Sequence, residues 1–185
     1  MKLTIKLTLL LLVILLIVFL IIKGHDFVMQ RVYQLEYTEY VEKYSKEENV
    51  DSKLIYAIIK SESNFKNNIT SGSGAIGLMQ LMESTAKEMA GKLDIDFPTK
   101  EILYDPETNI KIGIKYFAHL LNQYNGNTNL ALAAYKAGIG NVSKWIENGT
   151  IKEDGSDIEN IPFKETNNYV RKIIRDYKIY QKIYK

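Results

Sequence analysis

The 185-residue sequence contains no cysteine. Disulfide bonds, thiol catalysis and a lipid-modified cysteine near the N-terminus are therefore excluded, and stability must come from packing. The formal net charge is only +2, and no dense cluster of Lys and Arg stands out. Nucleic acid is consequently not expected as a partner. Hydrophobic residues make up 46% of the chain and charged residues 25%, which is a globular composition able to bury a core.

Alternating strand patterns of any length and internal repeats are also missing from the sequence. The chain instead contains segments whose apolar residues recur at helical spacing. We therefore predict a mainly α fold. The expected helices cover residues 28–46, 53–62, 84–92, 105–124, 128–135, 141–147 and 165–185.

A long apolar run opens the chain. Residues 7–22 are apolar apart from one threonine, with two lysines before them and Lys23 after them. Together with its flank, the run reaches roughly the 20 residues that span a bilayer. It ends without the small-residue cleavage site of a signal peptide, so we expect a retained, single-pass anchor rather than a cleaved peptide. The lysines on its N-terminal side favour a domain outside the cytoplasm.

The length suits one domain with an appendage. We expect residues 1–23 to form the signal anchor, 24–29 a short linker and 30–185 the folded domain. Partners expected at this level are the membrane, through the N-terminal helix, and a substrate of the domain.

One carboxylate occupies a position that suggests chemistry. The helix expected to end at Glu62 has Asp51 or Ser52 available as its N-cap. Glu62 continues the apolar stripe of that helix, and burial on such a stripe raises the pKa of a carboxyl group, as a general acid near neutral pH requires. The alternative is a helix end that has left the core, where Glu62 meets water. The apolar stripe consists of Leu54, Ile55, Ile58 and Ile59.

Four short segments together indicate a family. The segments are Glu62-Ser63, Gly77-Leu78-Met79-Gln80, Ala134-Tyr135-Lys136-Ala137-Gly138, and Glu165-Thr166 with Tyr169-Val170. In this order and spacing they resemble the lytic transglycosylase domain of the soluble murein transglycosylase type, which is related to goose-type lysozyme and to glycoside hydrolase family 23. The resemblance covers about residues 39–174.

The resemblance implies a lysozyme-like helical domain that cleaves the MurNAc–GlcNAc bond of peptidoglycan and leaves a 1,6-anhydro-MurNAc end. It places the catalytic role on Glu62. His25 and His119 are too far apart in the sequence to suggest a metal site, so we predict no metal and no cofactor. The substrate's own N-acetyl group would replace an enzyme nucleophile, a known exception to the two-carboxylate scheme. The residues implied to bind or line the site for glycan strands are Ser63, Met79, Gln80, Tyr135, Glu165 and Tyr169.

Two departures from the family pattern stand out. The family usually has asparagine where this chain has Lys136, and often proline where it has Glu83. Lys136 in place of asparagine is expected to weaken activity. Glu83 in place of proline is expected to have no effect, because glutamate also suits the first turn of a helix. Two alternatives to the transglycosylase remain. One is a muramidase that uses water on the same fold, which an acidic base opposite Glu62 would favour. The other is a catalytically silent wall-binding or scaffold protein, which Lys136 favours.

Overall fold

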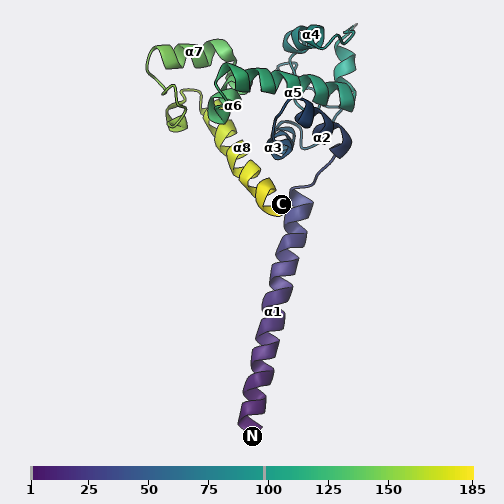
Figure 1. The fold of residues 1–185 in the computed structure, drawn as a ribbon, viewed down its shortest axis with the longest axis vertical. Coiled ribbons are helices and arrows are strands. Elements are labelled where there is room, and N and C mark those ends of the chain that lie inside the picture. Colours follow the sequence, from purple (N-terminus) through teal and green to yellow (C-terminus); the bar gives the residue numbers. More distant parts are fainter. Residues whose placement is uncertain (1, 98) are drawn as a thin grey trace. The chain divides into compact units, whose positions relative to one another are not determined.

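The computed structural model describes residues 2–97 and 99–185 (Figure 1). The chain divides into two compact units, which are described separately. One contains helix α1 (Lys2–Val32) together with Lys182–Lys185, and the other is formed by Leu35–Gln181. Within the first unit, the Tyr184 hydroxyl donates a hydrogen bond of 2.8 Å to the Tyr33 carbonyl.

Helix α1 is long and continuous. Its segment Leu7–Val32 has 26 residues and is long and apolar enough to cross a membrane. At 1.5 Å per residue it extends about 39 Å, more than a bilayer's hydrocarbon core. Residues 24–29, the expected linker, are helical, and the helix expected over 28–46 is divided between α1 and α2. Residue 1 of the expected anchor lies outside the described residues.

The division at residues 33–37 has a local cause. Tyr37 has a φ of 55°, in the left-handed region, and precedes α2 (Thr38–Glu47). A left-handed residue cannot continue a right-handed helix. Apolar periodicity spans the break, which is why the sequence pattern alone predicts one helix there.

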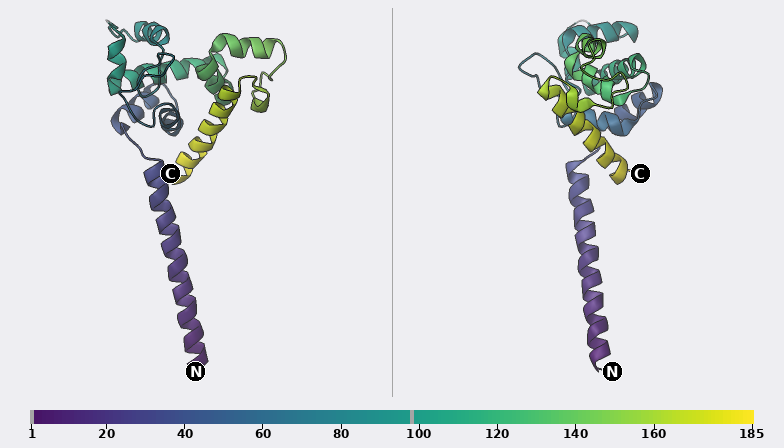
Figure 2. Two further views of the ribbon diagram at one scale, coloured as in Figure 1. Left: turned by 180° about the vertical axis from the view of Figure 1, so that it is seen from behind. Right: turned by 90° about the vertical axis from the view of Figure 1, so that its left-hand side faces the viewer.

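The second unit is built from helices around α5, and the prediction of a mainly α fold is confirmed. α5 contacts α2, α4, α6 and the short helix η1, while α3 packs on α2 and α7 on α6 (Figures 1 and 2). Within the described residues, β-pairing is limited to two isolated bridges. The remaining elements are α3 (Ser52–Glu62), α4 (Glu83–Lys92), η1 (Lys100–Tyr104), α5 (Pro106–Gln123), α6 (Thr128–Ala137), α7 (Ile139–Glu147), η2 (Ile158–Asn160) and α8 (Lys164–Ile183).

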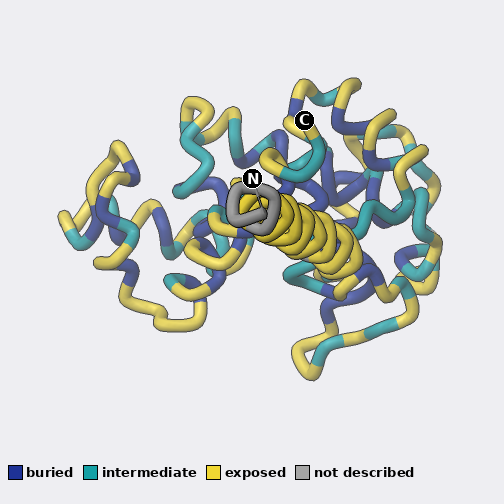
Figure 3. The backbone as a smooth tube through the Cα atoms, turned by 90° about the horizontal axis from the view of Figure 1, so that it is seen from below, coloured by how far each residue is buried: buried dark blue, intermediate teal, exposed yellow. Residues whose placement is uncertain are grey.

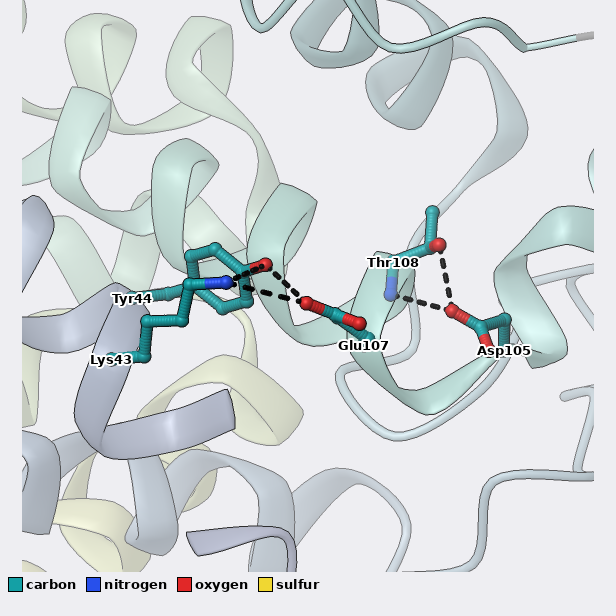
Figure 4. A network of polar contacts seen from close by, with 5 residues as sticks. All are labelled: Lys43, Tyr44, Asp105, Glu107 and Thr108. Atoms are coloured by element: carbon teal, nitrogen blue, oxygen red, sulfur yellow. Dashed lines mark hydrogen bonds and ion pairs between the residues drawn. The ribbon is translucent and has the colours of Figure 1, made fainter. Parts of the chain in front are cut away.

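The start of α5 is fixed by polar contacts. Asp105 caps it by accepting a hydrogen bond of 2.8 Å from the Thr108 amide, as the Asp-Pro pair predicts. Glu107 accepts a 2.6 Å hydrogen bond from the Tyr44 hydroxyl and lies 3.5 Å from the Lys43 ammonium (Figure 4). These contacts tie α5 to α2 at the end that lies next to the loop described below.

The core lies between these helices. Figure 3 shows buried residues (dark blue) concentrated within the Leu35–Gln181 unit, whereas the described side chains of α1 are exposed except for Met29, which is intermediate. Gly113 on α5 contacts Met79 so closely that a β-carbon there would collide with its thioether. The interior of the domain therefore supports the loop that carries Met79.

Candidate active site

Helix α3 delivers Glu62 as its last residue. Asp51 caps the helix start by accepting a 2.9 Å hydrogen bond from the Lys53 amide, which confirms the expected cap. At the other end, the Ser63 hydroxyl is buried and donates to the Ile59 carbonyl at 3.1 Å. Ser63 therefore secures the helix end in this structure, and its hydroxyl is engaged within α3.

A tight loop of residues 76–81 lies next to this helix end. Ile76 and Leu81 pair as an isolated bridge, with two backbone hydrogen bonds of 3.0 Å. Gly77 has a φ of 78°, and a β-carbon there would collide with the Asn109 side chain and the Leu103 carbonyl. Glycine is needed here for both its conformation and its small size. The loop is consequently a fixed element rather than a flexible linker.

Asn109 of α5 organises the loop and was not predicted from the sequence. It is fully buried, and its Oδ1 accepts a 2.8 Å hydrogen bond from the Met79 amide. Its Nδ2 donates to the Ile76 carbonyl at 3.0 Å and to the Leu103 carbonyl at 2.8 Å. The available signal was an asparagine beside Ile110 on a buried helix face, which indicates a satisfied polar group but not its partners.

Tyr135 of α6 holds the same loop from the other side of Met79. Its hydroxyl donates a 2.6 Å hydrogen bond to the Met79 carbonyl. Its ring contacts those of Tyr116 and Phe117 at centroid distances of 5.4 and 6.0 Å. Burial and the nearby Glu62 carboxylate raise the pKa of Tyr135 well above its usual value, so it stays a hydrogen-bond donor. The main chain of Met79 is thus held at both its amide and its carbonyl.

Tyr135→Phe should remove the hydroxyl bond while keeping the ring contacts. The Met79 carbonyl then loses its protein donor, and we expect the free energy of unfolding to fall by about 1–2 kcal/mol. The measurement is thermal unfolding followed by circular dichroism. Tyr116→Phe is the control, since the adjacent Tyr116 hydroxyl makes no hydrogen bond within the described part of the chain. Equal stability of the two variants would contradict this role.

Tyr169 of α8 lies against the Glu62 carboxyl. It is buried, and its hydroxyl acts on Glu62 as a hydrogen-bonding neighbour. Within the described residues, however, that hydroxyl makes no hydrogen bond of full geometry, so the contact is loose in this structure. Burial and Glu62 raise the pKa of Tyr169 well above its usual value. Its proton is therefore available to a carboxylate at position 62.

Glu62 itself is only partly exposed. Burial raises the pKa of its carboxyl above the ordinary glutamate value, and the Tyr169 hydroxyl and the Lys136 ammonium act in the opposite direction. Burial is the largest of these effects. The direction agrees with the expectation from the apolar stripe of α3.

Lys136 and Glu165 form an ion pair beside Tyr169. Lys136 Nζ lies 2.8 Å from Glu165 Oε1 and 5.6 Å from the centroid of the Tyr169 ring. This pair lowers the pKa of the exposed Glu165 carboxyl, which keeps it ionised. Lys136 at the family asparagine position is therefore engaged with α8 rather than directed only to solvent.

The expected site residues thus take different positions. Glu62, Tyr135, Glu165 and Tyr169 converge from α3, α6 and α8. Met79 reaches this group through its main chain, while its side chain is buried in the core. The other expected residues make hydrogen bonds within the domain. Ser63 bonds through its hydroxyl and Met79 through its main chain, and the Gln80 side chain donates to the Gly77 carbonyl at 2.9 Å.

No group of three or more His, Asp and Glu side chains that could hold a metal ion occurs among the described residues. The site is instead a carboxyl group surrounded by phenols, one ammonium and a rigid loop. Such an arrangement can transfer a proton to and from a bound ligand.

The model of the transglycosylase SLT domain family matches residues 39–158 of this chain. The chain belongs to this family. It is 33% identical over 148 residues to the soluble lytic murein transglycosylase of Salmonella typhimurium, covering 79% of this chain and 23% of that protein. It is 37% identical over 118 residues to membrane-bound lytic murein transglycosylase C of Serratia proteamaculans, covering 58% of this chain and 32% of that protein.

A solved structure extends the similarity to three dimensions. The SLT domain described here is similar to an inactive mutant of lytic transglycosylase Slt from Pseudomonas aeruginosa, with a TM-score of 0.74 and 36% identity. The match covers 81% of this chain and 24% of that one. The all-helical lysozyme-like fold of SLT domains is thereby confirmed for this chain. The match spans about a quarter of the length of the Salmonella and Pseudomonas proteins.

Proposed function

We propose that this SLT domain is a peptidoglycan lytic transglycosylase that cleaves the MurNAc–GlcNAc β-1,4 bond and forms a 1,6-anhydro-MurNAc end. The observation that carries the proposal is the partly buried Glu62 carboxyl, whose pKa is raised by burial and which lies beside the phenols of Tyr135 and Tyr169. A carboxyl group with such a pKa can be protonated when substrate binds, which a general acid requires. The activity in the names of the SLT-domain relatives supports the same reaction.

The proposed reaction uses Glu62 twice. The protonated carboxyl gives its proton to the glycosidic oxygen as the bond to the anomeric carbon breaks. The resulting carboxylate takes the proton of the sugar's 6-hydroxyl, and that oxygen bonds to the anomeric carbon. No water enters, and Glu62 ends protonated as it began. The Tyr169 hydroxyl stabilises the Glu62 carboxylate that forms between the two steps, because its proton is available to donate a hydrogen bond to a carboxylate oxygen.

Hydrolysis by a muramidase is the competing reaction, and one observation gives it a candidate base. Glu165 is ionised and acts electrostatically on Glu62. Its Oε1, however, is bound by Lys136 at 2.8 Å, and its side chain is 79% exposed. A base held by an ammonium is a poor acceptor of a water proton, which favours the transglycosylase.

We infer that the apolar segment Leu7–Val32 anchors the domain in a membrane. Its length suffices to span the hydrocarbon core. The lysines at its N-terminal side would leave the SLT domain outside the cytoplasm, where peptidoglycan lies. A membrane-bound lytic murein transglycosylase among the relatives agrees with this placement.

Mass spectrometry of digested peptidoglycan tests the proposed reaction. The full-length chain in non-ionic detergent should release muropeptides that end in 1,6-anhydro-MurNAc. Reducing-end products, heavier by one water, would instead identify a muramidase. Absence of cleavage by a folded chain that still sediments with the wall would support a silent binder and contradict both enzymatic functions.

The raised pKa of Glu62 predicts a pH-dependent cost to stability. Below the unfolded-state pKa the carboxyl is protonated in both states, and the cost is absent. As the pH rises through the folded-state pKa, the folded protein must ionise a partly buried group, and stability is lost. The melting temperature of Glu62→Gln should therefore rise relative to that of wild type as the pH increases from below the ordinary glutamate pKa. A difference that stays constant with pH would contradict the raised pKa.

A further inference from the structure

Lys136 places an ammonium group close to the proposed catalytic carboxyl. It lies in the last turn of α6, directly after Tyr135, and its side chain is 31% exposed. Two groups of α8 hold its Nζ: the Glu165 carboxylate at 2.8 Å and the face of the Tyr169 ring at 5.6 Å. Lys136 thus rests on the ring whose hydroxyl approaches Glu62.

The charged and titratable neighbours of Glu62 come from two helices. They are Tyr135 and Lys136 of α6, and Glu165, Tyr169 and Lys172 of α8. The loop of residues 76–81 contributes no titratable side chain. On α3 itself, Lys60 interacts with charges further along α8, including Asp176. Lys136 and Glu165 are the two of these neighbours that carry opposite charges and bind each other.

The ion pair between Lys136 and Glu165 is expected to contribute little to the stability of the fold. Glu165 is largely exposed, and exposed pairs contribute little to folding. Its electrostatic effect on the Glu62 carboxyl explains the pair better. An ammonium favours the ionised form of a nearby carboxyl, and would deprotonate the general acid if it paired with it directly. Lys136 makes its ion pair with Glu165 and not with Glu62.

We propose that Glu165 is a positioning residue that holds the Lys136 ammonium over the Tyr169 ring, and that this ion pair sets the upper pH at which Glu62 still acts as an acid. The proposal rests on the proposed function of Glu62. Glu165 opposes the charge of Lys136 and also fixes its place. Loss of Glu165 should therefore lower the pH up to which Glu62 acts as an acid, and loss of Lys136 should raise it.

Two single variants and their combination test the pair in the full-length chain. The measurement is kcat/KM for cleavage of soluble glycan strands as a function of pH. Glu165→Gln releases Lys136 toward Glu62, so the alkaline limb should move to lower pH. Lys136→Met removes the cation, so the limb should move to higher pH. At a fixed pH on the limb each shift should change kcat/KM by about three- to tenfold, with the double variant between the singles.

Controls separate this effect from net charge and from folding. Lys178→Met and Glu159→Gln make the same charge changes at exposed positions outside the site and should leave the limb unmoved. Melting temperatures of Glu165→Gln and Lys136→Met should stay close to wild type, because the pair is a minor contributor to stability. Limbs that do not move, or that move in the same direction in both variants, would overturn the proposal.

Titration of the Glu62 carboxyl by carbon-13 NMR tests the same coupling without any catalytic reaction. The signal is assigned by its loss in Glu62→Gln. Opposite displacements of its titration midpoint in Glu165→Gln and Lys136→Met would support the pair even if the chain cleaved no glycan, in which case only the proposed function would fail. Cleavage with unchanged midpoints would overturn the role of the pair and leave the proposed function standing.

Discussion

Glu62→Gln is expected to lower the rate of peptidoglycan cleavage by about 10²- to 10⁴-fold, the usual contribution of a general acid–base group. Glutamine matches the shape of glutamate but can neither give a proton to the glycosidic oxygen nor take one from the 6-hydroxyl. Both halves of the proposed reaction use this one carboxyl. The loss should therefore appear in kcat at every pH, while binding to glycan strands persists.

Glu147→Gln is the matched control for that experiment. Glu147 is the last residue of α7, as Glu62 is of α3, but it is exposed. Its substitution should leave cleavage unchanged. Circular dichroism must show the same helix content for both variants. Cleavage by a well-folded Glu62→Gln chain at the wild-type rate would remove the proposed mechanism.

Asn109→Ala should produce the largest loss of stability among single substitutions near the site. Three buried hydrogen bonds disappear together: those with the Met79 amide and with the Ile76 and Leu103 carbonyls. The backbone groups left without partners are shielded from water, so we expect a cost of about 3–5 kcal/mol in the free energy of unfolding. Cleavage should fall as well, because the loop that carries Met79 and Gln80 loses its support.

The stability of Asn109→Ala is compared with that of two further variants. Asn122→Ala changes an exposed residue of the same helix and should cost less than about 0.5 kcal/mol. Asn109→Asp keeps an acceptor for the Met79 amide but turns an oxygen toward two carbonyl oxygens, so it should also be strongly destabilised. Urea unfolding followed by circular dichroism measures all three. Similar stabilities for Asn109→Ala and Asn122→Ala would contradict the supporting role of Asn109.

Local signals in the sequence predict the position of Glu62 well. The apolar stripe of α3, the Asp51 cap and the Asp105-Pro106 start of α5 each follow from short-range rules, and the structure confirms them. These rules act within one helix turn, so they need no knowledge of the rest of the fold. The four motif segments add the family, which the SLT match confirms.

Long-range contacts were beyond the same reasoning. Asn109 is separated from Met79 by 30 residues, and its pattern on α5 does not show which backbone groups it binds. The pairing of Lys136 with Glu165 depends on how α6 and α8 pack, and the sequence alone allowed Lys136 to point to solvent. The break before α2 was hidden for another reason: Tyr37 is a left-handed residue without the glycine that usually marks one.

Digestion of purified peptidoglycan in water enriched in oxygen-18 tests the central claim most directly. The Glu62 carboxyl protonates the leaving group and then takes the proton of the 6-hydroxyl, whose oxygen bonds to the anomeric carbon. The released 1,6-anhydro-MurNAc ends should therefore carry no label throughout the time course. Glu62→Gln should yield neither product. Labelled reducing ends formed from the earliest time points would show that water attacks the anomeric carbon, and would contradict the proposed transglycosylase.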